Sequence, residues 1–478
     1  MEELPDLGYV ERLAATLGAS ESALRLLISL FAGYPLAVIH RLVFYGQAPN
    51  VQHLFFTLAS LAIGYFNFGW EIAHSFINIV LCHVLMRSLG GSLLCIVLAF
   101  TLNVMYLLVG YYSVDTFNVT VCWTTPQCVL TLRLTALAFN LYDGSKNEDE
   151  LSAEQKETAL KDVPSLLEMT GFSYFFGAFL TGPQFSFKRY MNFVNGAYSD
   201  SITGGPPRSV MPALQRLMAG VLYTLVYQVS DLIIPDSFLL SQSFADMTII
   251  TKCLVITLWG KLMLSKYVGC WLITEGVCIM AGLTYNGRDE NGNCLWNGCA
   301  NIHAVEFEKA STCQEYIQAF NVNTNKWMAK YIFKRLKWLG NRHISQFATL
   351  FFLALWHGLH SGYYNNFALE FFVVKFERDM ALVLAPVGLI HKFRSIPALG
   401  PSIIWLVKKL YAQFALSYAL VSFSLFNYDR YLKVYAEVYY VGHLFLVLLW
   451  PLLFALVLSP MIRKSSKPRD TKEAKKTE

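Results

Sequence analysis

Long apolar runs separated by short polar stretches make up most of this chain. Because a helix rises about 1.5 Å per residue, about 20 apolar residues cross a hydrocarbon core about 30 Å thick. The pattern therefore predicts an all-α polytopic membrane protein with about 11 transmembrane helices, and one or two further segments that lie on the bilayer or re-enter it. The candidate spans are 23–44, 52–68, 72–88, 91–112, 122–141, 165–181, 211–233, 247–265, 267–284, 346–364, 366–389, 402–426 and 436–459.

Polar stretches divide the chain into regions. Residues 1–20 form a polar leader that lacks the features of a cleaved signal peptide, so we expect the first span to act as the signal anchor. The membrane domain then covers 21–460. Within it, 143–162 carries seven acids and three lysines and is predicted to lie outside the membrane as a loop or surface helix.

A second polar segment covers 286–345. Its first part, 286–320, is rich in Gly and Asn and is typical of a lid or wall over the site of a membrane enzyme. Further upstream, Gly182-Pro183-Gln184-Phe185 is predicted to break a helix and to begin another near Lys188.

One late span holds two ionisable imidazoles. From Gln346 to Tyr364, His357 and His360 are the only titratable side chains apart from two tyrosines. In a continuous helix His357, His360 and Ser361 share one face, and Gly358 with Gly362 lets another helix come close. An ionisable group inside the bilayer is energetically costly, so by default it indicates a functional role. The structural alternative is a histidine that only hydrogen-bonds a neighbouring helix.

The stretch Phe320-Asn321-Val322-Asn323-Thr324-Asn325 leads into a predicted basic amphipathic helix at the membrane interface. Six Lys or Arg and no acid lie between Lys326 and Arg342. This density suits phosphate groups, either on a substrate or on anionic lipid head groups. One asparagine is enough to cap the helix, so the others can orient a reacting group or hydrogen-bond a developing oxyanion.

Composition and charge agree with a membrane protein. The chain is 55% hydrophobic and only 15% charged, with a mean hydropathy of +0.41. The net charge of +5 is concentrated in the tail, 461–478, which has seven basic residues and three acids and is therefore expected in the cytosol. Its end, Lys475-Lys476-Thr477-Glu478, resembles the dilysine retrieval signal of endoplasmic reticulum proteins.

The ten cysteines give little chemistry, because most of them sit in apolar runs. Cys294, Cys299 and Cys313, with His303 between them, do not have the CxxC spacing of a zinc site. We therefore expect neither a metal nor a cofactor.

A buried histidine, an asparagine and a basic helix together suit transfer of an acyl group from acyl-CoA to a lipid hydroxyl. An imidazole, with an unperturbed pKa of about 6.5, can accept the hydroxyl proton near pH 7, so His357 is the candidate general base. Two other classes stay open. A proton-relay transporter needs intramembrane acids, of which Glu275 is the best candidate, and an internal repeat, of which we detect none. A non-catalytic lipid-binding scaffold would not depend on His357.

Six motifs carry a resemblance to the lysophospholipid branch of the membrane-bound O-acyltransferase family, whose fold is a helix bundle enclosing a tunnel. The resemblance covers the chain from about residue 13 to the tail. The motifs are Gly182–Phe185, Trp271–Gly276, Trp296–Asn301, Phe320–Trp327, Lys334–Asn341 and Leu355–Gly362.

The resemblance implies that His357 and Asn321 are the catalytic pair. It also implies that acyl-CoA enters from the cytosol, and that a lysophospholipid from the bilayer receives a polyunsaturated chain at its sn-2 hydroxyl. Another lysophospholipid head group or a protein acceptor is the alternative, and no nucleic-acid partner is expected. The acyl-CoA-binding candidates are Asn325, Lys330, Lys334, Arg335 and Lys337. The candidates for lining the tunnel or positioning substrates are Trp356, His360, Ser361, Gln184 and Glu275.

Overall fold

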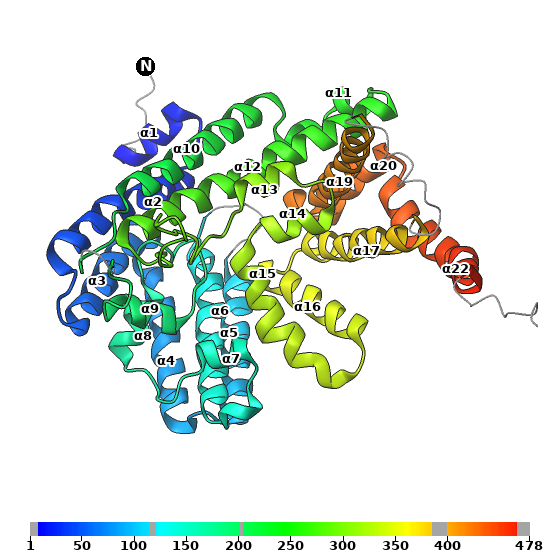
Figure 1. Ribbon diagram of the computed structural model, residues 1–478. Coiled ribbons are helices and arrows are strands. Elements are labelled where there is room, and N and C mark those ends of the chain that lie inside the picture. The colour runs from blue at the N-terminus through cyan, green and yellow to red at the C-terminus, as the bar shows by residue number, and fades with distance from the viewer. Residues whose placement is uncertain (1–7, 115–120, 201–203, 385–398, 466–478) are drawn as a thin grey trace, which may run out of the picture. The chain divides into compact units, whose positions relative to one another are not determined.

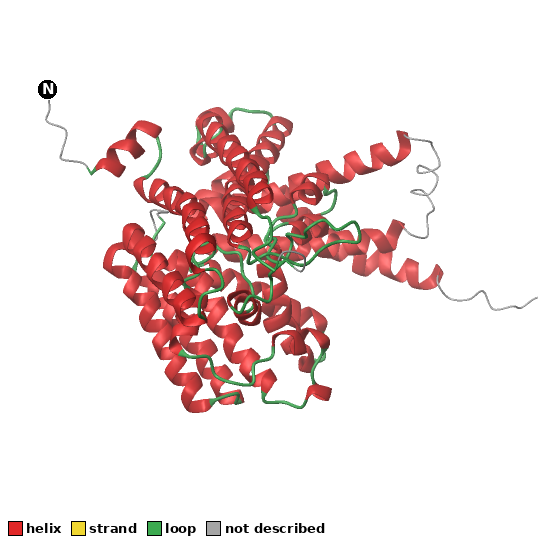
Figure 2. Cartoon of the chain, turned by 60° about the vertical axis from the view of Figure 1, so that its left-hand side comes forward, coloured by secondary structure: helices red, strands yellow, loops and turns green. Residues whose placement is uncertain are grey.

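The computed structural model describes residues 8–114, 121–200, 204–384 and 399–465 (Figure 1). Within these ranges the chain consists of helices and loops without a strand, and the one isolated β-bridge joins Arg288 to Cys294 (Figure 2). The predicted all-α fold class is confirmed. The lysine pair at 475–476 lies outside the described residues.

The chain divides into two compact units. The first holds the described residues up to Val229, together with Leu262–Phe307 and Ile317–Leu359, and the second holds Ser230–Lys261, Glu308–Tyr316 and the described residues from His360 onward. The first unit contains the predicted catalytic residues and the cavity described below.

The helices of the first unit pack mainly against helices near them in sequence. Contacts join α5 to α4, α6 and α16, and α3 to α8 and α9. The bounds are α1 (Tyr9–Leu17), α2 (Glu21–Ile39), η1 (His40–Phe44), α3 (Pro49–Phe68), η2 (Gly69–Ile72), α4 (Ala73–Leu89), α5 (Leu93–Ser113), α6 (Thr124–Gly144), η3 (Glu148–Glu150), α7 (Ala153–Thr158), α8 (Leu166–Ser173), α9 (Phe187–Val194), α15 (Val322–Met328), η5 (Ala329–Phe333), η6 (Lys334–Leu339) and α16 (Arg342–His357).

Four further helices have residues in both units: α10 (Val210–Ile233), α12 (Ile249–Ala281), α13 (Ala304–Lys309) and α14 (Cys313–Ala319). Helix α11 (Gln242–Ala245) belongs to the second unit. The two spans predicted at 247–265 and 267–284 are wrong as separate elements, because α12 runs through Lys266 as one helix of 33 residues. No proline or turn sequence interrupts it there.

The span predicted at 165–181 is also wrong. Helix α8 ends at Ser173, and an irregular stretch follows up to Ser186. Arg133, which is only 1% exposed, donates from its two Nη atoms to the carbonyls of Phe172, Ser173, Ala178 and Pro183. Because these buried carbonyls find a partner in a side chain, the backbone does not need to stay helical.

Six helical segments of the described chain are long and apolar enough to cross a membrane. They are Glu21–Phe44, Pro49–Leu89, Leu93–Ser113, Val210–Leu240, Ile249–Ala281 and His443–Ile462. The fold is therefore that of a multi-pass membrane protein, while the number of about 11 spans stays a prediction.

The span predicted at 346–364 is interrupted. Helix α16 ends at His357, and α17 begins at Ser361. Gly358 between them has φ 147°, a backbone conformation that favours glycine. The prediction that His357, His360 and Ser361 share one helical face is therefore wrong, because the helix stops at His357.

The second unit is built on α17 (Ser361–Leu384) and α19 (Leu399–Leu425), which pack along each other. A Cβ at Gly362 would lie 2.0 Å from the carbonyl oxygen of Ser422, so Gly362 does allow the close helix approach predicted for it. The unit also contains η4 (Asp236–Leu240), α20 (Tyr428–Glu437), η7 (His443–Leu449), α21 (Trp450–Leu453), η8 (Phe454–Leu458) and α22 (Ser459–Ser465).

Candidate active site

Asn321 lies at the start of α15 in a left-handed conformation, with φ 50° and ψ 44°. Asn tolerates this region better than most residues. Its side chain does not cap the helix; instead, its Oδ1 accepts a hydrogen bond of 3.3 Å from Nδ2 of Asn301. The capping role considered for this stretch therefore does not explain Asn321.

The other two asparagines of this stretch hold the backbone. Asn323 donates from Nδ2 to the carbonyls of Cys299 and Ala300, and Asn325 donates to those of Ile317 and Phe320. Asn325, predicted to bind acyl-CoA, thus lies within α15 and holds the segment that precedes this helix.

His357 is the last residue of α16, and the residue before it is fixed at two points. The indole of Trp356 donates to the carbonyl of Cys128, and its own carbonyl accepts from the hydroxyl of Tyr111, each at 2.8 Å. The rings of Trp356 and His357 meet edge to face with centroids 4.7 Å apart. These contacts fix the position of the C-terminal end of α16 and therefore of the His357 imidazole.

The segment that carries Asn321 packs against the helix that carries His357. Helix α16 contacts η5 and η6, and the rings of Trp327 and Phe352 stack with centroids 6.1 Å apart. The indole of Trp327 is also anchored, because it donates to the carbonyl of Leu132. The buried cluster around them includes Met328, Tyr331, Ile332 and Trp356.

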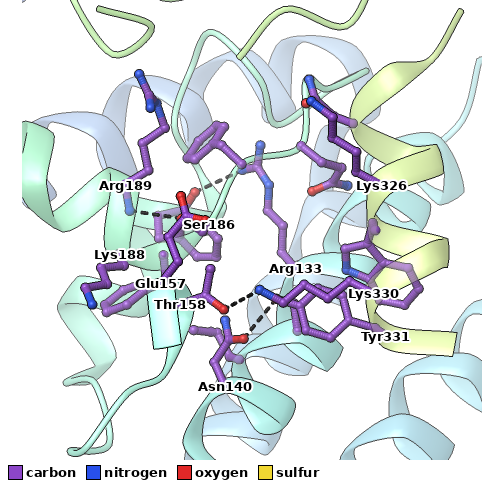
Figure 3. Close-up of a pocket in the computed structure, with 18 of the residues that line it drawn as sticks. Arg133, Asn140, Glu157, Thr158, Ser186, Lys188, Arg189, Lys326, Lys330 and Tyr331 are labelled. Atoms are coloured by element: carbon purple, nitrogen blue, oxygen red, sulfur yellow. Dashed lines mark hydrogen bonds between the residues drawn. The ribbon is translucent and has the colours of Figure 1, made fainter. Parts of the chain in front are cut away.

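A cavity of about 430 Å³ adjoins the helical run from α15 to η5, opposite α9 and beside the end of α7 (Figure 3). Its cationic lining residues outnumber its acidic ones, Glu154 and Glu157. The cations are Arg133, Lys188, Arg189, Lys326 and Lys330. A cavity with this charge balance favours an anionic ligand.

Two arginines of the lining are held by the protein. Arg189 donates to the carbonyls of Leu283 and Tyr285, and Arg133 uses its Nη atoms as described above. However, Nε of Arg133 and Oε1 of Gln184 are buried and have no hydrogen-bond partner among the described residues. Gln184 uses its Nε2 to donate to the carbonyl of Val129. Both atoms are enclosed by protein and present no surface to the cavity.

Acids of the 143–162 region form ion pairs with basic residues of η6. Lys334 pairs with Glu154, and Arg335 pairs with the fully buried Asp143. Lys330 lies in the cavity wall, where its ammonium donates to Thr158 Oγ1 and to the carbonyl of Glu154, and burial lowers its pKa. Lys337 is exposed and does not line the cavity. The sequence could not show that this basic stretch is partly neutralised, because the acids that pair with it lie about 190 positions away.

The remaining candidates fall in different places. Gln184 lines the cavity, and Glu275 is fully buried beside Arg216, with Nε to Oε1 at 3.0 Å. His360 and Ser361 belong to the second unit; there His360 packs on Phe426 and Ser361 accepts from the hydroxyl of Tyr431.

A family model described as the membrane-bound O-acyltransferase family matches residues 108–421 of this chain. The match includes Asn321, His357 and the residues that line the cavity. The chain belongs to this family. It is accordingly a membrane-bound acyltransferase, as the sequence motifs implied.

Curated relatives of the chain in this acyltransferase family extend over nearly its whole length. A lysophospholipid acyltransferase 5 from Homo sapiens is 44% identical over 97% of this chain and 93% of its own length. One from Drosophila melanogaster is 39% identical, over 94% and 90% of the two chains. A lysophospholipid acyltransferase from Schizosaccharomyces pombe is 28% identical, over 94% and 89%.

Sequence reasoning missed several residues of this acyltransferase site. Arg133 was hidden inside a predicted span, although a lone arginine in an apolar run is itself a signal. Lys188 was noted only as the start of a helix, and Arg189 beside it was given no role. Asn301 ends one of the six motifs but was given no role, and Arg216 gave no signal, because their contacts are with residues 20 or more positions away.

Proposed function

We propose that this acyltransferase moves an acyl chain from acyl-CoA to the sn-2 hydroxyl of lysophosphatidylcholine. The names of its relatives support a lysophospholipid acceptor. The observation that carries the proposal is that Asn321 and the cavity cations Lys326 and Lys330 lie on one helical run. At about 1.5 Å per residue, Asn321 and Lys330 are separated by roughly 14 Å along the axis. The pantetheine arm of CoA, which joins its thioester to its pyrophosphate, can bridge such a separation.

The charge balance of the cavity supports this donor. The cationic lining residues outnumber the acidic ones, and the ammonium groups of Lys326 and Lys330 suit the phosphates of CoA.

The reaction needs only residues of this chain. His357 takes the proton of the acceptor hydroxyl as its oxygen attacks the thioester carbonyl. The side-chain N–H of Asn321 donates to the oxyanion that forms. When the tetrahedral intermediate collapses, the carbon–sulfur bond breaks, and the CoA thiolate leaves and takes the proton from His357. An ester and CoA are the products.

We further propose a polyunsaturated acyl chain, location in the endoplasmic reticulum and a cytosolic C-terminus, which rest on the motifs and on the basic tail. A different head group or a protein acceptor is the alternative within the family. The transport alternative loses the acid on which it depended, because Glu275 is paired with Arg216 and accepts a hydrogen bond from the backbone N–H of Asn301.

The test uses membranes that express the native chain or His357→Ala at equal levels, supplied with arachidonoyl-CoA and lysophosphatidylcholine. We expect phosphatidylcholine from the native protein and none above control membranes from the variant. Lysophospholipids with serine, ethanolamine or inositol head groups, supplied in parallel, identify the acceptor. Absence of native product with every acceptor would overturn the proposal.

A further inference from the structure

The amide orientation of Asn301 can be fixed from a single unambiguous donor. Oδ1 of Asn301 accepts a hydrogen bond of 3.1 Å from the backbone N–H of Asn323. A backbone nitrogen can only donate, so this end of the Asn301 amide must be the oxygen. The other end is therefore the NH₂ group, and it points at the side chain of Asn321.

This assignment fixes the orientation of Asn321 as well. Nδ2 of Asn301 can only donate, so the atom of Asn321 that it meets at 3.3 Å must be the oxygen. The amide of Asn321 is thereby turned so that its own NH₂ group is the end directed away from Asn301. Asn321 consequently offers a donor, and not an acceptor, to a reacting group.

Asn301 is itself held on all sides. It is only 2% exposed, its carbonyl accepts from the N–H of Val322, and its N–H donates to Oε2 of Glu275 at 3.4 Å. Glu275 is fully buried and is paired with Arg216. Removing one member of such a buried network leaves the others unsatisfied, so the arrangement is rigid.

We propose that Asn301, supported by Glu275, is a positioning residue that aims the Asn321 N–H at the thioester oxygen. This inference rests on the proposed function, because it assumes the catalytic role of Asn321. It adds that Asn321 acts as a hydrogen-bond donor and that Asn301 determines this.

The experiment compares Asn301→Ala in the native and in the Asn321→Ala background, with initial rates measured against both substrates at equal amounts of folded protein. Asn78→Ala is the matched control, because Asn78 donates to Oδ1 of Asn103 in another buried pair of asparagines. We expect Asn301→Ala to lower kcat by about tenfold or more, with both KM values nearly unchanged. This loss is smaller than the roughly 10²–10³-fold loss expected when an oxyanion donor itself is removed. In the Asn321→Ala background the same change should cost less than about twofold, because residues that act as a unit are not additive.

The outcomes separate the two proposals. An inactive native protein overturns the proposed function itself. An active native protein in which Asn301→Ala costs the same factor in both backgrounds, or no more than Asn78→Ala, overturns the positioning role. Asn321→Asp keeps an acceptor but has no N–H, so a kcat near the native value in that variant would overturn the donor assignment.

Discussion

Tyr111 on α5 donates a hydrogen bond of 2.8 Å to the backbone carbonyl of Trp356, 245 positions later and next to His357. Carbonyls in the last turn of a helix lack an intrahelical donor, so this hydroxyl satisfies one of them. The hydrogen bond therefore holds the end of α16 against the end of α5.

Removal of this hydroxyl should disturb catalysis more than folding. Tyr111→Phe should lower kcat several-fold, because the backbone before His357 loses its anchor, while the free energy of unfolding falls by only about 1 kcal/mol. Tyr112→Phe is the control, since Tyr112 is 86% exposed. Kinetics and thermal melting in detergent check both values; equal kcat in the two variants would contradict the anchoring role.

Loss of the Asn321 side chain should lower both rate and stability. We expect Asn321→Ala to lower kcat by roughly 10²–10³-fold, measured at equal amounts of folded protein. Because the change leaves Nδ2 of the buried Asn301 without its acceptor, the free energy of unfolding should also fall, by about 1–3 kcal/mol. A loss of rate below about threefold would remove Asn321 from the catalytic pair.

The cavity cations should affect one substrate. Lys326→Gln combined with Lys330→Gln should raise KM for acyl-CoA about tenfold while saturation by lysophosphatidylcholine stays nearly unchanged. Lys156→Gln, an exposed lysine on α7 that does not line the cavity, is the matched control. A similar rise in KM for both substrates would indicate general attachment to the membrane surface.

The sequence-based candidates Lys334 and Lys337 can be compared in the same assay. Lys334 is paired with Glu154, and neither lysine lines the cavity. We therefore expect their Gln variants to raise KM for acyl-CoA less than the Lys326 and Lys330 pair does. A larger effect from Lys334→Gln or Lys337→Gln would place the phosphates along the outer part of the helix.

The break after His357 should depend on glycine. With φ 147° at Gly358, a Cβ costs about 1–3 kcal/mol, so Gly358→Ala should lower thermal stability and reduce kcat. Gly205→Ala is the control, because a Cβ there meets no atom within 4 Å and its φ is not positive. A native melting temperature in Gly358→Ala would show that the backbone can adopt another conformation without cost.

The sequence alone determined the all-α membrane class, most helix positions and the family. These follow from apolar run length and from short motifs, which are local properties of the chain. Spans such as 91–112 and 211–233 match α5 and α10 closely, because an apolar run of that length has no stable alternative in a bilayer.

The tertiary structure decided which polar groups far apart in sequence form hydrogen bonds and ion pairs. It ended α8 at Ser173 through the guanidinium of Arg133, and it neutralised Lys334 and Arg335 with acids from the 143–162 region. It also turned the Asn321 amide through its contact with Asn301. A buried hydrogen bond or ion pair depends on which residues fold against each other, and helical periodicity carries no information about partners far apart in sequence.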